Sequence, residues 1–293
     1  MERKVCNFYS KSKSSSLKIL ITGASGFIGK NLVSKLLKKK NQITVIVRNK
    51  KKIKDQEWYN RVEVFEGDIF KKKNIFFNKH YDVLIHLAWD KLDNFNSIKH
   101  HQNLEKHKRF IESALKNKIK RFIFAGTCQE YGQINGKLNE NMKIKPSTSY
   151  SKSKNELRKF IFSKKKDFNI TIQWIRIFYL YGKYQSKDTL FGLLDEAIKR
   201  KKKIFNMSSG EQIRDYLDIK NLCKIFSLLL YNSKVNGVVN GCSGKKIKLI
   251  DLVKKYIGKN KIILNRGYYK IPKYEQMYFW GCCKKLNKLF HND

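Results

Sequence analysis

Short apolar runs alternate with amphipathic stretches over the first two thirds of the chain. Apolar runs with the length and β-branched content of buried strands lie at 17–22, 42–47, 62–66, 81–86, 121–125 and 170–178. Stretches with apolar residues three and four positions apart, which is typical of helices that cover a sheet, lie at 30–40, 104–117 and 150–163. Strands that alternate with helices predict a parallel sheet with right-handed crossovers.

Beyond residue 178 the pattern is less regular. It predicts helices at 188–203, 218–232 and 249–257, and a short strand at 237–241 that can rejoin the sheet. We therefore expect an α/β fold, with a Rossmann-type, doubly wound parallel sheet and a smaller, interleaved C-terminal substrate lobe. The sheet would be built from 17–178 and rejoined by about 213–241, and the lobe from 179–212 and 242–293. Residues 1–16 are charged and rich in Ser and Lys, so we expect a flexible leader there.

Glycines follow a G-x-x-G-x-x-G spacing between the first strand and the first helix. Gly23, Gly26 and Gly29 occupy these positions. Glycine there permits a tight turn and lets the backbone approach a pyrophosphate, to which a helix N-terminus offers free N–H groups. The flanking strand and helix favour a dinucleotide site over a plain turn.

The residue that follows the second strand distinguishes the two nicotinamide dinucleotides. NAD sites usually place an acid there to bind the ribose 2′-hydroxyl, whereas this chain has Arg48. A cation suits a 2′-phosphate, so the sequence favours NADP(H) over NAD(H); the alternative is an arginine that only stacks on adenine. Asp68 and Ile69 follow the third strand and are expected to meet the adenine, although Asp68 could instead cap the next turn.

Tyr150 and Lys154 lie four residues apart, on one face of a predicted helix. An ammonium beside a phenol stabilises the phenolate and lowers the phenol's pKa from about 10. Such a phenol can pass a proton to or from a substrate hydroxyl while hydride moves. The pair arises readily by chance in a lysine-rich chain, but it follows the fifth strand, whose end at Thr127 supplies a further hydroxyl.

The balance of charge is strongly basic. The chain has 64 lysine and arginine residues against 24 acidic ones, a formal charge of +40. Nucleic-acid sites rely on arginine for bidentate contacts, whereas here the cations are mostly lysines spread along the whole chain. We therefore expect a solvated basic surface and no nucleic-acid partner. The remaining consequence is a positive field that attracts anionic substrates such as nucleotides.

The composition excludes several other classes of protein. Hydrophobic residues make up 41% of the chain and only two residues are proline, which excludes disordered and collagen-like chains. The best apolar run, 225–231, is about a third of a membrane span, so no membrane association is expected. The six cysteines form no Cys-x-x-Cys pair and no Cys/His cluster with zinc spacing. We therefore expect no metal site, and a reduced, cytoplasmic location.

Together these motifs resemble those of the extended short-chain dehydrogenases/reductases, in particular the NAD(P)-dependent nucleotide-sugar epimerase/dehydratase family. The matching pieces run in family order from about residue 17 to 257. They are Thr22-Gly-Ala-Ser-Gly-Phe-Ile-Gly29, Gly67-Asp68, Ile85-His-Leu-Ala88, Asn103, Phe124-Ala-Gly-Thr127 with Tyr131-Gly132, Tyr150-x-x-x-Lys154, Arg176-Ile-Phe with Tyr181-Gly182, Arg214-Asp-Tyr216 with Asp218, and Asn240-Gly-Cys-Ser-Gly244.

The resemblance implies roles for individual residues. Tyr150 would be the general acid/base, Lys154 would tune it and bind the nicotinamide ribose, and Thr127 would hydrogen bond the reacting oxygen. Arg214 would bind the diphosphate of a nucleotide-diphosphate sugar. Cofactor contacts are implied for Gly23, Ser25, Gly26, Phe27, Ile28, Gly29, Arg48, Asp68, Ile69, Leu87, Ala88 and Lys154. Substrate contacts are implied for Thr127, Cys128, Gln129, Tyr150, Tyr179 and Arg214.

Two of these substrate positions, Arg214 and Tyr179, also allow another interpretation. Arg214 could instead form a surface salt bridge with Asp215 or Asp218. The family motif before Tyr181-Gly182 usually contains Asn, which binds the sugar nucleotide, and this chain has Tyr179. The nucleotide pocket is therefore expected to be built differently, and the base stays open.

The two residues after Thr127 separate the activities within the family. In 4,6-dehydratases an Asp-Glu pair stands there, because elimination of water needs an acid and a base, but this chain has Cys128 and Gln129. A dehydratase is therefore disfavoured. The fucose-synthase type carries a cysteine two residues after the hydroxyl residue, which here is Gln129. Cys128 is thus either a proton-shuttling base or a packed thiol.

Two activities remain within the family. One is reduction of the C4 ketone of a 4-keto-6-deoxy sugar nucleotide by NADPH, with Tyr150 as general acid. The other is 4-epimerisation through transient oxidation at C4. Arg48 and the compact C-terminal lobe favour the reductase. A non-catalytic Rossmann protein that binds polyanions is a third hypothesis, which the intact Tyr150, Lys154 and Thr127 disfavour. By resemblance we also expect a homodimer formed by the helices at 104–117 and 150–163.

Overall fold

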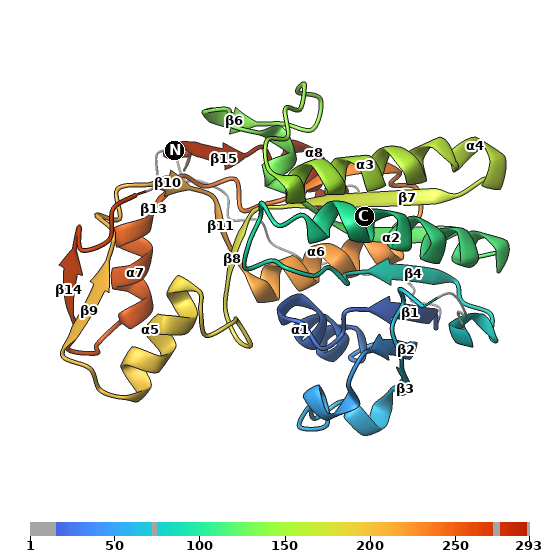
Figure 1. Ribbon diagram of the computed structural model, residues 1–293, viewed down its shortest axis with the longest axis horizontal. Helices are drawn as coiled ribbons and strands as arrows, with labels where there is room; N and C mark the ends of the chain where they lie inside the picture. The colour runs from blue at the N-terminus through green and yellow to red at the C-terminus, as the bar shows by residue number, and fades with distance from the viewer. Residues whose placement is uncertain (1–15, 72–74, 272–275, 292–293) are drawn as a thin grey trace.

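A seven-stranded parallel sheet forms the centre of the computed structural model, which describes residues 16–71, 75–271 and 276–291. The strands lie in the order β12-β7-β5-β4-β1-β2-β3 (Figure 1). The sheet grows outward from β1 to β3 and then in the opposite direction from β4, which creates a switch point beside β1. The predicted α/β fold with a Rossmann-type parallel sheet is therefore confirmed. The strands are β1 (Lys18–Thr22), β2 (Gln42–Val47), β3 (Glu63–Glu66), β4 (Val83–His86), β5 (Arg121–Thr127), β7 (Thr171–Ile177) and β12 (Gly237–Gly241).

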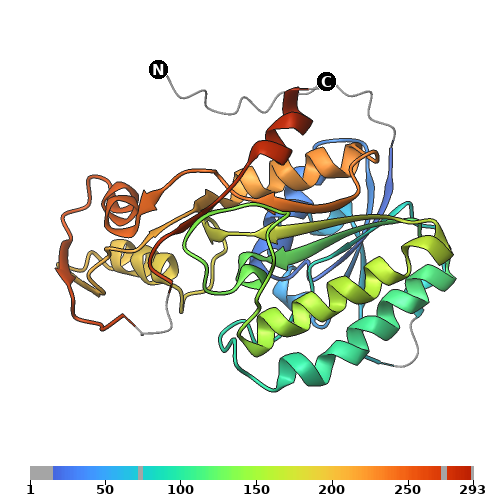
Figure 2. The ribbon, with the colours of Figure 1, turned by 90° about the horizontal axis from the view of Figure 1, so that it is seen from above.

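Helices cover both faces of this sheet (Figure 2). Successive strand residues point to opposite faces, so Ile19 and Ile21 join one apolar core while Leu20 joins the other. The first core includes Phe226 of α6 and the second includes Phe110 of α2, each fully buried. The helices are α1 (Phe27–Leu36) and α6 (Ile219–Tyr231) on one side, and α2 (Lys99–Lys116), α3 (Ser149–Ser163) and the short α4 (Lys165–Phe168) on the other.

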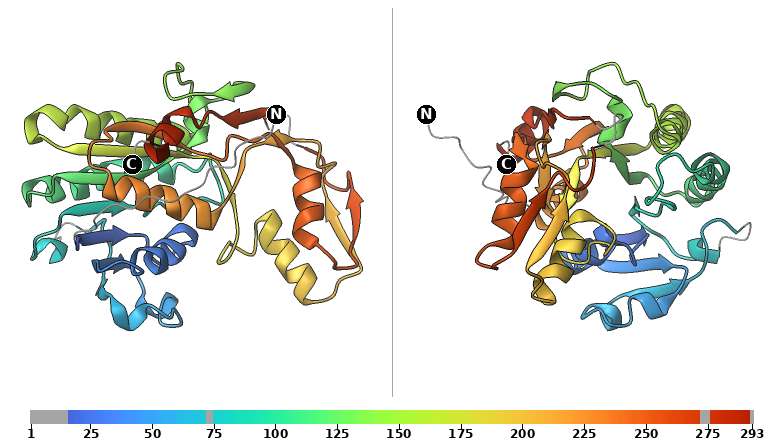
Figure 3. Two further views of the ribbon diagram at one scale, coloured as in Figure 1. Left: turned by 180° about the vertical axis from the view of Figure 1, so that it is seen from behind. Right: turned by 60° about the vertical axis from the view of Figure 1, so that its left-hand side comes forward.

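A smaller lobe extends from the carboxyl ends of β7 and β12 (Figures 1 and 3). Its apolar core includes Phe191, Leu194 and Val253, and β9 pairs in parallel with β14. Its elements are α5 (Leu190–Lys199), β9 (Ile204–Met207), α7 (Leu249–Ile257) and β14 (Ile263–Arg266). Because this lobe begins where the strands end, its inner face lies beside the edge of the sheet at which Rossmann folds bind ligands.

Short paired strands connect the lobe to the sheet. β8 pairs with β11 in parallel, β10 pairs with β13 antiparallel, and β15 pairs with β6 in parallel. They are β6 (Gly136–Leu138), β8 (Tyr179–Tyr181), β10 (Ile213–Arg214), β11 (Tyr216–Asp218), β13 (Ile247–Lys248) and β15 (Phe279–Gly281). The short 3₁₀ helices are η1 (Lys50–Lys52), η2 (Tyr59–Arg61), η3 (Ile75–Phe77) and η4 (Cys128–Tyr131).

The last helix differs from the expected division of the chain. We expected 242–293 to belong to the lobe, but α8 (Lys284–His291) lies against β12 of the central sheet. The reason is burial, since Leu286 is 2% exposed and belongs to the same apolar core as α1 and α6. The leader expected at 1–16 falls almost wholly outside the described residues.

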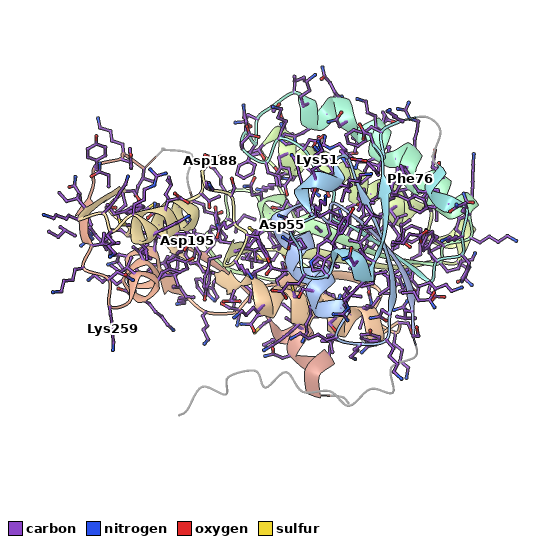
Figure 4. All side chains as sticks on the ribbon, turned by 90° about the horizontal axis from the view of Figure 1, so that it is seen from below. Lys51, Asp55, Phe76, Asp188, Asp195 and Lys259 are labelled. Atoms are coloured by element: carbon purple, nitrogen blue, oxygen red, sulfur yellow. The ribbon has the colours of Figure 1, made fainter. Side chains whose placement is uncertain are left out.

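The basic surface is spread over both lobes. Long charged side chains project outward all around the molecule, for example Lys51 in η1 and Lys259 beyond α7 (Figure 4). Both of these lysines are exposed. Within the described part of the chain, no helix combines the length and apolar character needed to cross a bilayer.

Candidate active site at the carboxyl edge of the sheet

The glycine loop joins β1 to α1 in a tight turn. The Gly26 N–H donates to the Gly23 carbonyl oxygen at 3.0 Å, and Gly23 has a φ of +75°. A Cβ at Gly23 would lie 2.7 Å from the Ala88 nitrogen, and one at Gly29 would overlap the Gly23 carbonyl oxygen. A Cβ at the exposed Gly26 would meet that oxygen at 3.3 Å. The fold itself therefore requires two of these glycines, and the third keeps the outer face of the loop open.

The N-terminus of α1 fits an anion such as a pyrophosphate. Gly26 is the N-cap residue and supplies no side-chain cap, and the first turn has no acidic residue. The N–H groups and the positive end of the helix dipole therefore face the loop without a competing carboxylate. Ser25 is partly buried here, and Phe27 and Ile28 pack against the apolar core behind the loop. These residues fit the dinucleotide that the sequence predicts.

Arg48 lies beyond β2 and reaches across to Asp90, which follows β4. Its two terminal nitrogens lie 2.7 and 3.2 Å from the two carboxylate oxygens. β1 lies between β2 and β4 in the sheet, so this ion pair passes close to the start of the glycine loop. The Arg48 side chain is 64% exposed, and a surface pair of this kind contributes about 1 kcal/mol or less. A 2′-phosphate would have to compete with Asp90 for Arg48.

The residues that follow β3 and β4 line the next part of the edge. The Asp68 carboxylate accepts a hydrogen bond from the Phe70 N–H at 3.0 Å. This contact caps the turn, which was the alternative role expected for Asp68. Ile69 is buried in the core on the α2 side. Leu87 and Ala88 are partly buried, and the Ala88 N–H donates to Thr22 Oγ1 at 3.2 Å. Contacts of these residues with a cofactor stay predictions.

Thr127 at the end of β5 and Tyr150 at the start of α3 lie together. The Thr127 hydroxyl is near enough to the Tyr150 phenol to influence its pKa. Thr148 caps α3 by accepting the Ser151 N–H at 3.1 Å, which fixes the first turn that carries Tyr150. Tyr150 is 8% exposed, and burial raises its pKa above the ordinary value, while the neighbouring Thr127 hydroxyl opposes that rise.

Lys154 lies one turn further along α3 and is 3% exposed. Its Nζ donates to the Ala125 carbonyl oxygen at 2.8 Å and lies 3.8 Å from the centre of the Trp89 ring. Burial lowers the pKa of Lys154 to about 7. The expected lowering of the Tyr150 pKa by Lys154 is not found, because loss of water dominates at both side chains and the ammonium faces Ala125 and Trp89.

A fully buried carboxylate, Glu130, supports the loop that carries Thr127. It accepts hydrogen bonds from the Thr127 N–H at 3.0 Å, the Trp174 indole N–H at 2.8 Å and Arg176 Nε at 2.9 Å. The Thr127 side chain in turn accepts the Gln129 N–H at 3.2 Å. This Thr-x-x-Glu capping box holds the Thr127 hydroxyl in one place relative to β5 and β7.

Cys128 and Gln129, the residues that separate the activities, have different surroundings. Cys128 is 7% exposed in a small apolar cluster, and burial raises the pKa of its thiol to about 12. A thiol with this pKa is protonated at neutral pH, so the structure favours the packed thiol over the proton-shuttling base. Gln129 is partly buried and its side-chain oxygen accepts a hydrogen bond from Thr148 at 3.4 Å.

Arg214 is buried beneath the segment that precedes β15. Its Nε and Nη2 lie 3.1 and 2.8 Å from the Gln276 carbonyl oxygen, and its guanidinium lies 4.7 Å from the centre of the Tyr179 ring. The side chain is 3% exposed, so the alternative of a surface salt bridge is wrong. Asp215 instead accepts from Ser243 and from backbone N–H groups, and loss of water raises its pKa.

No three histidine, cysteine or acidic side chains of the described residues gather as a metal site would require. The described residues instead place a glycine loop at this edge of the sheet, followed by a hydroxyl, a phenol and an ammonium.

Comparison with known proteins assigns the chain to a family. Residues 19–241 match the model of the NAD dependent epimerase/dehydratase family. The chain belongs to this family. The short-chain dehydrogenase/reductase resemblance is therefore confirmed, and with it the prediction of an enzyme of that type.

Three proteins with different activities are similar to this chain. The dTDP-6-deoxy-L-talose 4-dehydrogenase (NAD(+)) of Aggregatibacter actinomycetemcomitans is 30% identical over 275 residues, which cover 90% of this chain and 99% of that protein. The UDP-glucuronic acid 4-epimerase of Bacillus cereus, solved with UDP-glucuronic acid and NAD, has a TM-score of 0.81 at 24% identity and covers 94% of each chain. A dTDP-glucose 4,6-dehydratase of Streptomyces venezuelae, solved with NAD, has a TM-score of 0.78 at 17% identity, covering 93% of this chain and 90% of that chain.

Three residues of the candidate site were not predicted from the sequence. Glu130 had a signal, since Thr127-x-x-Glu130 is a capping-box spacing. Trp89 directly follows the Ile85–Ala88 motif, but an aromatic residue there gives no indication of its partner. Asp90 had no signal, because its pairing with Arg48 depends on the order of strands in the sheet.

Proposed function

We propose that this enzyme reduces the C4 ketone of a nucleotide-linked 4-keto-6-deoxy sugar with a nicotinamide dinucleotide. The observation that carries the proposal is that the Thr127 hydroxyl and the Tyr150 phenol lie together at the carboxyl edge of the sheet, with Lys154 on the next turn of α3. The relative with 30% identity supports it, since its name describes oxidoreduction at C4 of a 6-deoxy sugar nucleotide.

Each residue of the site has a role in this reaction. The bound dinucleotide would supply the hydride. Tyr150 would donate its phenolic proton to the C4 oxygen, and the Thr127 hydroxyl would hydrogen bond the same atom and orient it. Burial raises the pKa of Tyr150, so the phenol is protonated at neutral pH, which is the form that a general acid needs. Lys154 would bind the ribose of the dinucleotide once that group is present.

For the dinucleotide we propose NAD(H) rather than the NADP(H) that the sequence favoured. Asp90 already neutralises Arg48, the residue on which the preference for a 2′-phosphate depended. The relative named above carries NAD(+) in its name, and the two solved structures described above were determined with NAD. Titration of the purified protein with NADH and NADPH tests this, and tighter binding of NADPH would contradict it.

The substrate would be a nucleotide-diphosphate sugar, with Arg214 and Tyr179 beside it. Arg214 is covered by the Gln276 carbonyl, so its contact with a diphosphate would require that segment to move aside. Elimination of water remains disfavoured. Glu130 is the buried acid next to Thr127, but its oxygens are taken by Thr127, Trp174 and Arg176, and Cys128 is a protonated thiol.

A second candidate is 4-epimerisation by transient oxidation at C4. The similarity to the UDP-glucuronic acid 4-epimerase, at a TM-score of 0.81, favours it. The same Tyr150 and Thr127 would serve both activities, because both exchange a proton at the C4 oxygen. The two differ in whether the dinucleotide is consumed.

The homodimer and the cytoplasmic location remain predictions. The exposed positions of α2 and α3 carry polar or charged side chains, so a dimer through these helices would be a polar contact. These positions are Lys99, His101, Gln102, Glu105, Arg109, Lys116, Lys152, Glu156, Lys159 and Ser163.

The deciding experiment incubates the protein with a panel of 4-keto-6-deoxy nucleotide sugars and NADH, and follows absorbance at 340 nm (a general property of reduced nicotinamide). Consumption identifies the reductase, whereas isomerised sugar without net consumption identifies the epimerase. Tyr150→Phe should reduce turnover by about 10² to 10⁴-fold while NADH still binds. The matched control is Tyr256→Phe, which removes a hydroxyl bonded to Asp195 in the small lobe. Full activity of Tyr150→Phe would remove Tyr150 from the mechanism.

A further inference from the structure

Trp89 occupies the space between the catalytic pair and the buried core of the Rossmann sheet. Its ring centre lies 3.8 Å from Lys154 Nζ, and it forms an edge-to-face contact with the Tyr150 ring at 6.0 Å between centroids. Among the described residues, the Lys154 ammonium also donates a hydrogen bond to the Ala125 carbonyl oxygen. The indole face is therefore a principal partner of the buried ammonium.

Two histidines of α2 hold this indole in one orientation. The His107 ring stacks on it at 4.4 Å and 9°, and the indole N–H donates to His100 Nδ1 at 3.0 Å. His100 Nε2 lies 2.9 Å from the Asn94 carbonyl oxygen, so the remaining ring nitrogen of His100 has a fixed acceptor. His107 is in turn bonded to His86, whose other nitrogen contacts Thr22 Oγ1 at 2.9 Å. The indole is thus built into a network that begins at the strand before the glycine loop.

A cation on an aromatic face is stabilised most where water is excluded. Lys154 meets that condition, since it is 3% exposed. We propose that Trp89 is a positioning residue for catalysis, whose indole face holds the Lys154 ammonium beside Tyr150 through a cation–π contact. This inference rests on the proposed function, because it assigns Lys154 to that reaction.

The pKa values of two histidines, Tyr150 and Cys128 near Lys154 are all shifted away from pH 7. Burial lowers the pKa of His86 to about 3 and that of His107 well below its usual value, and the Lys154 charge adds to both effects. Burial raises the pKa of Tyr150 and brings that of Cys128 to about 12. Glu130 is paired with Arg176 and favours the charged form of Lys154. The titration is therefore followed at the Lys154 side chain itself.

Fluorinated tryptophan tests the contact without changing the shape of the side chain. Stepwise fluorination at position 89 withdraws electrons from the ring and weakens its attraction for a cation. The pKa of Lys154 is followed by NMR of lysines labelled at Nζ and Cε, with the signal assigned by its loss in Lys154→Met. We expect the pKa to fall progressively, by about one pH unit for the fully fluorinated ring. The alkaline limb of kcat/KM for the dinucleotide should shift by the same amount.

The matched control is fluorination at position 280. Lys246 lies 4.2 Å from the centre of the Trp280 ring, so the same type of contact is weakened away from Tyr150. We expect no change in the Lys154 titration or in the pH profile. An unchanged Lys154 titration after fluorination at position 89 would overturn the inference. The NMR measurement needs no substrate, so a failure of the proposed function would appear separately, as absence of turnover in the unmodified protein.

Discussion

At the scale of single residues, burial controls the chemistry of the site. Tyr150 and Lys154 are both almost fully buried, and the loss of water favours the neutral form of each. It raises the pKa of Tyr150 and lowers the pKa of Lys154. We expected Lys154 to lower the pKa of Tyr150, but burial raises it. A phenol that stays protonated can donate a proton as a general acid, so the raised pKa still supports reduction. The role of Arg48 also depends on its surroundings, because its ion pair with Asp90 competes with binding of a 2′-phosphate.

Asp90→Asn tests the cofactor choice at the residue scale. The substitution removes the carboxylate that pairs with Arg48, so the Arg48 guanidinium beyond β2 no longer has this competing anion. Because a surface ion pair contributes about 1 kcal/mol, we expect the ratio of NADPH to NADH affinity to rise about fivefold. Fluorescence titration of both dinucleotides measures it. Glu196→Gln, which breaks an exposed arginine–carboxylate pair in α5, should leave the ratio unchanged. An unchanged ratio in Asp90→Asn would show that Arg48 does not contact the 2′ position.

At the scale of elements, the glycine loop combines two separate requirements. Gly23 and Gly29 are needed by the fold, since a Cβ at either would overlap backbone atoms of the turn or of the residues after β4. Gly26 caps α1 with its backbone and leaves the N–H groups of the first turn open. The fold therefore requires Gly23 and Gly29, whereas Gly26 is the glycine that we expect to meet a bound anion.

Alanine at Gly26 and at Gly29 should therefore have different effects. Gly29→Ala forces the turn apart and should lower the free energy of unfolding by about 1–3 kcal/mol. Gly26→Ala places its methyl group 3.3 Å from one oxygen and should change stability by less than about 1 kcal/mol, yet it should weaken NADH binding at least tenfold. Urea unfolding and calorimetric titration distinguish the two. Normal NADH affinity in Gly26→Ala would mean that the pyrophosphate does not approach this face.

At the scale of the whole molecule, two lobes meet at one edge of the sheet and a basic surface surrounds both. The lobe formed by α5, α7, β9 and β14 begins at the carboxyl ends of β7 and β12, where Thr127 and the glycine loop also lie. The formal charge of +40 is spread over exposed lysines such as Lys51 and Lys259 rather than gathered by a motif (Figure 4). Such a field should attract phosphorylated ligands without selecting a nucleic-acid sequence.

Binding of RNA should accordingly be weak and strongly dependent on salt. Dispersed lysine–phosphate contacts release counterions, so we expect any binding at 50 mM salt to fall at least a hundredfold by about 0.2 M. Fluorescence anisotropy with a labelled single strand measures this. An equally charged polyphosphate should compete as well as RNA does. Binding that persists near 0.2 M salt would support a dedicated nucleic-acid site and contradict the expectation.

The sequence by itself determined the features that depend on neighbours along the chain. Alternating apolar runs predicted the strands and their parallel arrangement, and the spacings Gly23–Gly29 and Tyr150–Lys154 located the glycine loop and the helix face of the proposed site. The helix boundaries differ from the prediction, since α1 begins at Phe27 and α2 at Lys99, earlier than the apolar pattern predicted. Local periodicity and spacing act through the backbone, so these features could be predicted from one sequence.

Tertiary structure decided everything that depends on burial and on the order of strands. It packs α8 on β12 and buries Arg214 beneath Gln276. It joins Arg48 to Asp90 across β1, and it places the Trp89 indole against Lys154. Residues distant in the chain meet only when the sheet is assembled, and water is excluded only then. The charge state and the partners of a side chain therefore follow from the fold rather than from its motif.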